Sequence, residues 1–154
     1  MNVNSKEIQY ELASRLNSLC NKLHDEFGIN CGGCCFIAYC IAKLLELDGF
    51  KFSLIVFDDR YNLQDFSELF DLPEPMSHYA IILEYPDNVN AEAINCVEED
   101  FNNSYQDFAV TSEDILNYYL NNSWNSCYQT TNNYLIKSII KKVYYEFTNN
   151  FRER

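Results

Sequence analysis

The chain has 154 residues, the length of one domain, so we expect a single domain over residues 1–154. Hydrophobic residues make up 47% and aromatic residues 16%, which is enough to bury a core and excludes a disordered chain. Lys and Arg total 11 against 23 Asp and Glu, giving a net charge of −12. A charge of that sign repels phosphate groups, which argues against nucleic acid or an anionic membrane surface as the partner.

The sequence contains no apolar stretch near the ~18 residues that span a bilayer, and its first residues lack the apolar core of a signal peptide. We therefore expect a cytoplasmic protein. The seven cysteines are an odd number, whereas a disulfide scaffold uses an even number at wide spacing. Clustered cysteines in a reducing compartment favour thiol chemistry, metal binding or ordinary burial.

Two helices are expected first along the chain. In residues 6–27 the apolar side chains recur at spacings of three and four, which predicts an amphipathic helix ended by Gly28. After a short loop, residues 34–47 are apolar on nearly every side and are followed by Asp48 and Gly49. This pattern predicts a buried central helix.

The rest of the chain mixes strands and helices. Runs rich in β-branched and aromatic residues predict strands at residues 51–57, 77–85 and 92–98. Helical patterns and turn residues predict further helices at residues 65–70, 111–120 and 133–151. A turn-rich segment joins the second and third strands, as in an antiparallel hairpin. The order of these helices and strands along the chain predicts an α+β domain whose antiparallel sheet packs on the 34–47 helix.

A cysteine at the start of that helix is the main candidate for chemistry. The positive end of a helix dipole favours a thiolate, and Cys34 opens the central helix directly after Gly32 and Gly33. The two glycines would let a substrate come close. The unpaired N–H groups of a first helical turn can stabilise an oxyanion, to which Asn30 could add a side-chain amide.

A thiol nucleophile also needs a base, and the chain has two histidines. His24 lies on the polar side of the first predicted helix, whereas His78 begins an apolar strand. Hydrolases that use a thiol nucleophile orient the catalytic histidine with a third polar group. Asn95 lies on the predicted partner strand, on the same face as Ala93 and Val97, and its buried amide would need partners. The sequence therefore suggests Cys34, His78 and Asn95 as one site.

These elements resemble the papain-like and transglutaminase-like cysteine enzymes. Residues 31–36, Cys-Gly-Gly-Cys-Cys-Phe, are similar to the papain-type signature Cys-Gly-Ser-Cys-Trp-x-Phe. The transglutaminase-type core, with Gly-x-Cys, an Ala one helical turn on and a Gly after the helix, is similar to Gly32-x-Cys34, Ala38 and Gly49. In that family the His follows at the start of a strand, and an Asp or Asn lies on the next strand.

The resemblance covers residues 28–98 and implies a Cys34 nucleophile, a His78 general base and an Asn95 that orients the imidazole. Three departures accompany it. The Trp beside the nucleophile and the Asp-Pro that often ends the transglutaminase pattern are absent, and Gly28 stands where papain-type enzymes carry a Gln oxyanion donor. A non-catalytic member of the superfamily is therefore an alternative.

Other readings of the same residues stay open. Cys31 is the alternative nucleophile, because Asn30-Cys31-Gly32-Gly33 is loosely similar to the Asp-Cys-Ser-Gly of bacterial cell-wall peptidases. Asn122, in an Asn-Ser-Trp sequence, is a second candidate for the third residue. Cys31 and Cys34 have the spacing of zinc ligands, but a second close pair is missing and single residues (Cys96, Cys127 and His78) would have to converge. Cys20, Cys40, Cys96 and Cys127 are otherwise expected to fill the core.

The sequence thus predicts a cysteine-dependent hydrolase or acyl transferase that cleaves an amide, peptide or ester bond through a thioester and uses no cofactor or metal. The acidic composition favours a cationic peptide, protein or small amide as substrate. The alternatives are an inactive papain-like domain that binds another protein, and a Cys-rich zinc-binding domain.

Overall fold

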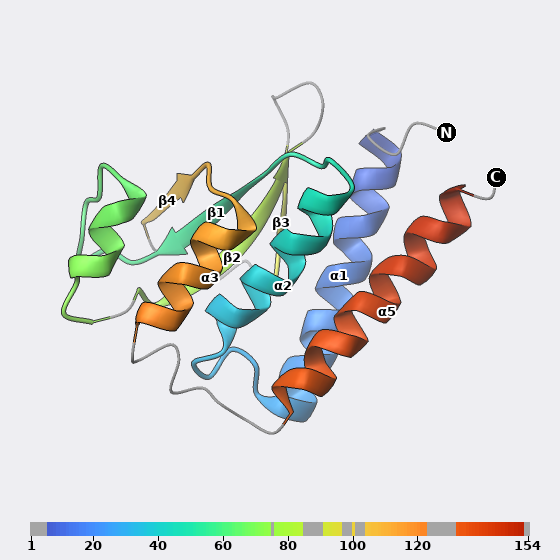
Figure 1. The fold of residues 1–154 in the computed structure, drawn as a ribbon, viewed down its shortest axis with the longest axis horizontal. Helices are drawn as coiled ribbons and strands as arrows, with labels where there is room; N and C mark the ends of the chain where they lie inside the picture. The colour runs from blue at the N-terminus through green and yellow to red at the C-terminus, as the bar shows by residue number, and fades with distance from the viewer. Residues whose placement is uncertain are drawn as a thin grey trace.

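The chain is an α+β protein with a four-stranded antiparallel sheet (Figure 1). The structure is a computed structural model that describes residues 6–74, 76–84, 91–96, 100, 104–122 and 132–152. The helices and strands follow in the order α1 (Lys6–Phe27), α2 (Cys34–Leu47), β1 (Phe52–Phe57), the 3-10 helix η1 (Phe66–Asp71), β2 (His78–Glu84), β3 (Ala91–Ile94), β4 (Tyr105–Phe108), α3 (Ser112–Asn121) and α5 (Asn133–Arg152).

The sheet has the strand order β3-β2-β1-β4, with every neighbouring pair antiparallel. Strand β3 ends at Ile94, earlier than the sequence pattern suggested, because the next residue, Asn95, has a positive φ of 65° that leaves the extended conformation. The pattern missed β4 because its side chains are exposed or half-buried and include Gln106 and Asp107, so it has no run of apolar residues.

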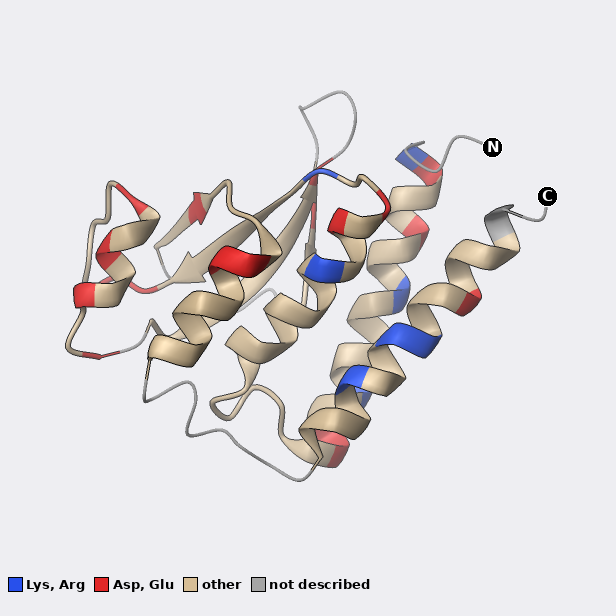
Figure 2. Ribbon diagram, in the orientation of Figure 1, with Lys and Arg blue, Asp and Glu red and all other residues tan. Residues whose placement is uncertain are grey.

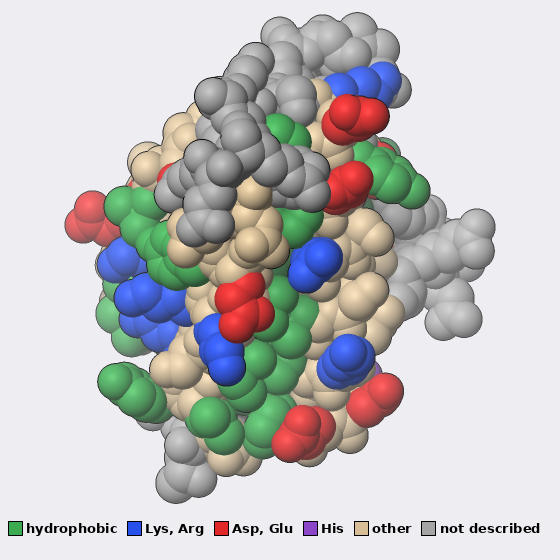
Figure 3. Space-filling model, turned by 90° about the vertical axis from the view of Figure 1, so that its right-hand side faces the viewer, with side chains coloured by type: hydrophobic (Ala, Val, Ile, Leu, Met, Phe, Trp, Pro, Cys, Tyr) green, Lys and Arg blue, Asp and Glu red, His purple; other side chains and the backbone are tan. Residues whose placement is uncertain are grey.

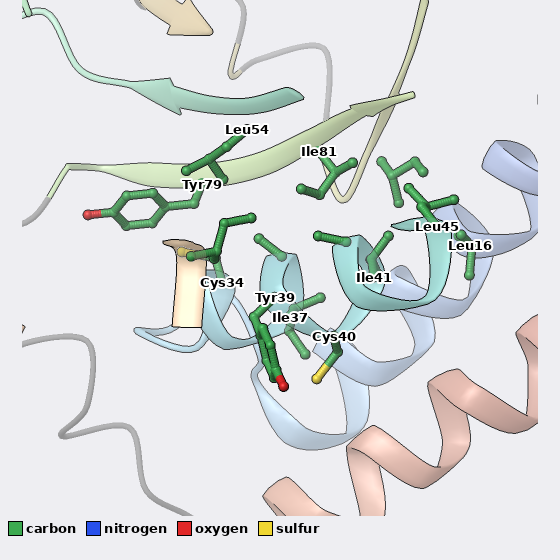
Figure 4. Close-up of a cluster of buried hydrophobic side chains, with 14 of the residues drawn as sticks. Leu16, Cys34, Ile37, Tyr39, Cys40, Ile41, Leu45, Leu54, Tyr79 and Ile81 are labelled. Carbon is green, nitrogen blue, oxygen red and sulfur yellow. The ribbon is translucent and has the colours of Figure 1, made fainter. Parts of the chain in front are cut away.

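Helix α2 packs on the sheet with α5 on its other side, while α1 packs beside α5 and β3, and Figure 1 shows α2 and α3 across one face of the sheet. The sequence of α2 is apolar on nearly every side because the helix is buried, as expected: ten of its residues are buried. Figure 4 shows Ile37 and Ile41 of α2 in the same cluster as Tyr79 and Ile81 of β2. The core thus holds the first residue of α2 against the first residues of β2.

Hydrogen bonds fix α3 beside α2. Thr111 and Asp114 form a capping box at the start of α3. Glu46 of α2 accepts hydrogen bonds from the backbone N–H of Ser112 at 2.9 Å and from its hydroxyl at 2.7 Å.

Among the helices that the structure describes, none combines the length with the apolar character that a membrane span requires.

Candidate active site

Cys34 is the first residue of α2, and its side chain is buried, with 5% exposed. The residue before it, Gly33, is the N-cap and has no side chain that could accept a hydrogen bond from the first turn. The first backbone N–H groups of a helix have no intrahelical acceptor. They are therefore available to a negative charge that forms at or near the Cys34 sulfur.

The first residue of β2 is His78, which pairs with Phe57 of β1 and stacks on its ring with centroids 5.9 Å apart. The His78 side chain is 12% exposed. Strand pairing and ring stacking therefore fix the imidazole at the end of the sheet where α2 begins.

The imidazole ring of His78 is hydrogen-bonded to the main chain through Nε2. The Nε2 atom lies 2.7 Å from the backbone carbonyl oxygen of Asn95. Because a carbonyl oxygen only accepts hydrogen bonds, Nε2 must carry the proton, which leaves the Nδ1 lone pair of neutral His78 for another donor. Cys34 raises the pKa of His78 through a side-chain hydrogen bond and through its charge, so the thiol lies close to the ring. With Nε2 protonated, Nδ1 is the ring nitrogen that could accept the proton of Cys34.

The charge balance at His78 favours the imidazolium form. Burial by itself lowers the pKa of His78, but the hydrogen bond and the charge of Cys34, together with the Asn95 carbonyl and Asp100, raise the pKa above its ordinary value of 6.5. The Asp100 carboxylate lies 3.8 Å from Nε2. An imidazolium beside a sulfur stabilises the thiolate over the neutral thiol.

Asn95 contacts His78 through its main chain, whereas the sequence pointed to its side chain. The Asn95 side-chain amide instead forms a reciprocal pair with Asn30, with N···O distances of 2.9 and 3.2 Å. Asn95 is 7% exposed and has a φ of 65°, a conformation that Asn tolerates better than most residues. Its torsion directs the carbonyl at the imidazole, and its side chain holds the loop before α2.

Asn17 was not among the residues expected at the site, and it fixes the position of Asn95. It accepts a hydrogen bond from the Asn95 backbone N–H at 2.7 Å and donates one to the Ala93 carbonyl at 2.7 Å. It lies on α1, where the sequence does not distinguish it from the many other polar residues of that helix. The sequence places His24 on the polar side of the same helix, and in the structure its Nδ1 accepts a hydrogen bond from the Asn30 backbone N–H at 3.1 Å.

A cleft of about 520 Å³ opens beside His78, Asn95 and Asn30. Its remaining walls come from Asn21, His24, Asp25, Ser77, Cys96 and Asp100. Two carboxylates and no Lys or Arg line it, so its field is negative. Burial and the nearby Asp100 raise the pKa of Cys96 to about 12, which keeps this thiol neutral. Cys34 is not among the residues that line the cleft.

The other cysteines have different surroundings. Cys31 is exposed on the loop before α2. Burial raises the pKa of Cys20 to about 12 and that of Cys35 well above its ordinary value, so both are core residues without thiolate character at neutral pH. Cys127 lies outside the described residues, and so do Ser123 and Trp124 of the Asn-Ser-Trp sequence.

Two further expectations concern the zinc site and Asn122. Across the described ranges, no group of three or more His, Cys, Asp or Glu side chains is arranged to hold a metal ion. Asn122 follows α3, and its side chain lies 3.3 Å from the hydroxyl of Tyr118. Asn95, rather than Asn122, is therefore the Asn that contacts His78 among these residues.

No protein-family model, curated protein or solved structure matches the chain. The features that point to a function are therefore the chain's own: the side chains of Cys34 and His78 and the backbone carbonyl of Asn95.

Proposed function

We propose that the protein is a cysteine-dependent hydrolase or acyl transferase of papain-like or transglutaminase-like fold, with Cys34 as nucleophile and His78 as general base. One observation carries the proposal. Cys34 acts on the imidazole of His78 and raises its pKa, while Nε2 of the same ring donates to the Asn95 carbonyl. Nucleophile, base and orienting acceptor are the three parts that thiol catalysis requires.

In the first half of the reaction, Nδ1 of His78 takes the proton from the Cys34 thiol. The sulfur attacks the carbonyl carbon of an amide or ester, a C–S bond forms, and the carbonyl electron pair moves to the oxygen. Backbone N–H groups at the uncapped start of α2 stabilise this oxyanion. The C–N or C–O bond then breaks, and the imidazolium protonates the leaving amine or alcohol.

In the second half, His78 removes a proton from water or from an acceptor amine, which attacks the thioester carbon. The C–S bond breaks, and the sulfur leaves as a thiolate that regains its proton from the imidazolium. The cycle consumes one water or amine and needs no redox partner. Throughout it, the Asn95 carbonyl stabilises the positive ring through Nε2.

The negative field of the cleft favours a substrate that is positively charged near the reacting carbonyl. Asp25 and Asp100 lie in the cleft walls, and the whole chain has a net charge of −12. A cationic peptide, protein or small amide would gain from this field, and an anionic one would be repelled.

An activated ester tests the proposal directly. Intact protein is mixed with p-nitrophenyl acetate, and the acetyl adduct is located by mass spectrometry of the digest. We expect a burst of p-nitrophenolate with acetylation at Cys34, and loss of both in Cys34→Ser. The matched control is Cys31→Ser, which should keep the burst. Acetylation at Cys31 alone, or at no cysteine, would contradict the proposal.

A binding module without catalysis is the second candidate, and one observation favours it. Cys34 is 5% exposed and does not line the cleft, so a substrate carbonyl must displace neighbouring groups to reach the sulfur. In that case the cleft would bind a cationic partner without forming a thioester. The same experiment separates the two functions, because a binding module would give no burst.

A further inference from the structure

A second cavity lies on the opposite side of α2 from the sheet, where α2 packs beside α5. Its volume is about 190 Å³. Its walls are Tyr39, Cys40, Lys43, Leu44 and Leu47 of α2, with Lys137, Lys141 and Tyr145 of α5. We call it the α2–α5 groove, and it shares no residue with the cleft beside His78.

The floor of the α2–α5 groove is apolar. Cys40 and Leu44 are buried, with 4% and 7% exposed, and Figure 4 shows Tyr39 and Cys40 on the side of α2 that faces away from the sheet. Leu47 at the rim is 68% exposed. An apolar ligand that covers this surface would therefore remove it from water, which is favourable in proportion to the area covered.

Three lysines stand around this floor. Lys43 and Lys137 come from different helices, and their ammonium groups lie 5.9 and 6.0 Å from the centroid of the Tyr39 ring. Lys141 lines the groove one helical turn beyond Lys137. Figure 2 shows basic segments on the adjoining stretches of α2 and α5, and Figure 3, which views the α5 side, shows basic side chains beside hydrophobic ones.

These cations stand out in an acidic protein. Within the part of the chain that the structure describes, the ion pairs involve Lys51, Arg60 and His78, and none involves a lysine of the groove. Lys43 instead reaches the Tyr39 hydroxyl at 3.4 Å. No carboxylate of the described residues lines the groove, and ammonium groups gathered in this way repel one another and attract an anion. The lysines thus give the apolar groove a positive rim.

We propose that the α2–α5 groove binds a small organic carboxylate whose body is a single aromatic ring on a short chain. The apolar floor would cover the ring, and the lysine ammonium groups would bind the carboxylate. The volume fits this choice, since a protein cavity of roughly 150 Å³ holds benzene. A dinucleotide or a long acyl chain would exceed the groove.

The test compares three ligands that share one body and differ in charge. The ¹⁵N-labelled protein is titrated with 3-phenylpropionate, 3-phenylpropionamide and 3-phenylpropylamine, and amide shifts are followed by NMR. We expect the carboxylate to shift residues of α2 and α5 and to bind about tenfold more tightly than the neutral amide, as for one charged hydrogen bond. The amine should bind most weakly.

Matched lysine variants sharpen the test. Lys137→Gln and Lys141→Gln should each weaken 3-phenylpropionate binding about fivefold, whereas Lys142→Gln, which removes the same charge from the same helix outside the groove, should change it less than twofold. Thermal unfolding of each variant checks that it is folded.

Four results would overturn the proposal. The first is equal affinity for the three ligands, and the second is an equal effect of Lys141→Gln and Lys142→Gln. The third is binding of an oligo-glutamate peptide at α2 and α5 with no response to 3-phenylpropionate, which would make the groove a protein-docking surface. Shifts confined to the cleft beside His78 would also contradict it, without bearing on the reaction at Cys34.

Discussion

Cys34 and Cys40 lie on the same helix and are about equally buried, with 5% and 4% of the residue exposed, yet their surroundings differ. Cys40 faces away from the sheet, into the apolar floor of the α2–α5 groove. Burial raises the pKa of Cys40 to about 12, although the charges of Lys137 and Lys43 act in the opposite direction. Cys34 instead opens the helix and acts on His78, whose pKa it raises.

At Cys40, nearby positive charge is not enough to lower the pKa of the thiol. Two lysines near Cys40 do not offset the cost of placing an anion in an apolar setting. Cys34 differs in that it acts on His78, the proposed base, and lies at a helix start, where the first N–H groups have no intrahelical acceptor. The contrast depends on the imidazole, so the strongest test removes it.

The variant His78→Gln should produce the largest effect. A Gln amide can still donate to the Asn95 carbonyl, but it cannot take the proton of Cys34. We expect the rate at which iodoacetamide alkylates Cys34 at neutral pH to fall about 100-fold, the contribution of a positioned base. Labelling at each cysteine is measured by mass spectrometry of the digest.

Two other thiols serve as internal references in that experiment. Exposed Cys31 should be labelled at the same rate in both proteins, and Cys40 should stay unlabelled until the protein unfolds. Equal rates at Cys34 with and without His78 would remove the distinction between Cys34 and Cys40. Circular dichroism checks that the variant is folded.

A smaller effect is expected in the pH dependence of stability. The pKa of His78 is raised above 6.5 in the folded protein, so folding favours the protonated ring. Its contribution to the free energy of unfolding is therefore fully present below pH 6.5 and is lost as the pH rises through the raised folded value.

Urea unfolding of the wild-type protein and His78→Gln over a pH series measures this contribution. The difference between their unfolding free energies should decrease as the pH rises above 6.5. A difference that instead grows with pH would mean that folding favours the neutral ring.

The smallest effect is expected for Asn95→Gly. Glycine keeps the backbone carbonyl and adopts a positive φ readily, so the contact with His78 survives while the amide pair with Asn30 is lost. Alkylation of Cys34 should change by less than about threefold, because the hydrogen bond that sets the His78 tautomer is retained. A 100-fold loss would show instead that the Asn95 side chain orients the imidazole.

The matched variant Asn95→Ala separates the effect of the backbone torsion on stability from the effect of losing the side-chain amide. Alanine also keeps the carbonyl, but a left-handed conformation costs a residue with Cβ about 1–2 kcal/mol. We therefore expect Asn95→Ala to unfold at lower urea concentration than Asn95→Gly.

Much of the fold follows from periodicity, because the long helices and the inner strands bury regular apolar faces. The pattern of α1 and α2 gave their bounds, and the apolar strands β1 and β2 lie where expected. Strand β4 could not be recognised, since its edge position leaves its polar side chains half-exposed. The apolar alternation around Asn95 also suggested a longer β3, since a single left-handed residue leaves no trace in an alternating pattern.

The candidate site was foreseeable only in part. A helix start after two glycines and a histidine at a strand start indicated Cys34 and His78, because each position has a known chemical consequence. Sequence alone does not reveal that a backbone carbonyl accepts the Nε2 hydrogen bond, since every residue has one. Asn17 was missed for a similar reason, because only the packing of α1 beside β3 brings its amide to Asn95.

The main-chain contact to His78 has a consequence for how such a centre can change over evolutionary time. Because the acceptor belongs to the peptide backbone, selection at position 95 acts on a torsion angle. Glycine or aspartate could replace the asparagine there without removing the acceptor, provided that the loop before α2 finds another anchor. A sequence search that requires a particular side chain as the acceptor for the histidine would then miss homologous sites that use a backbone carbonyl.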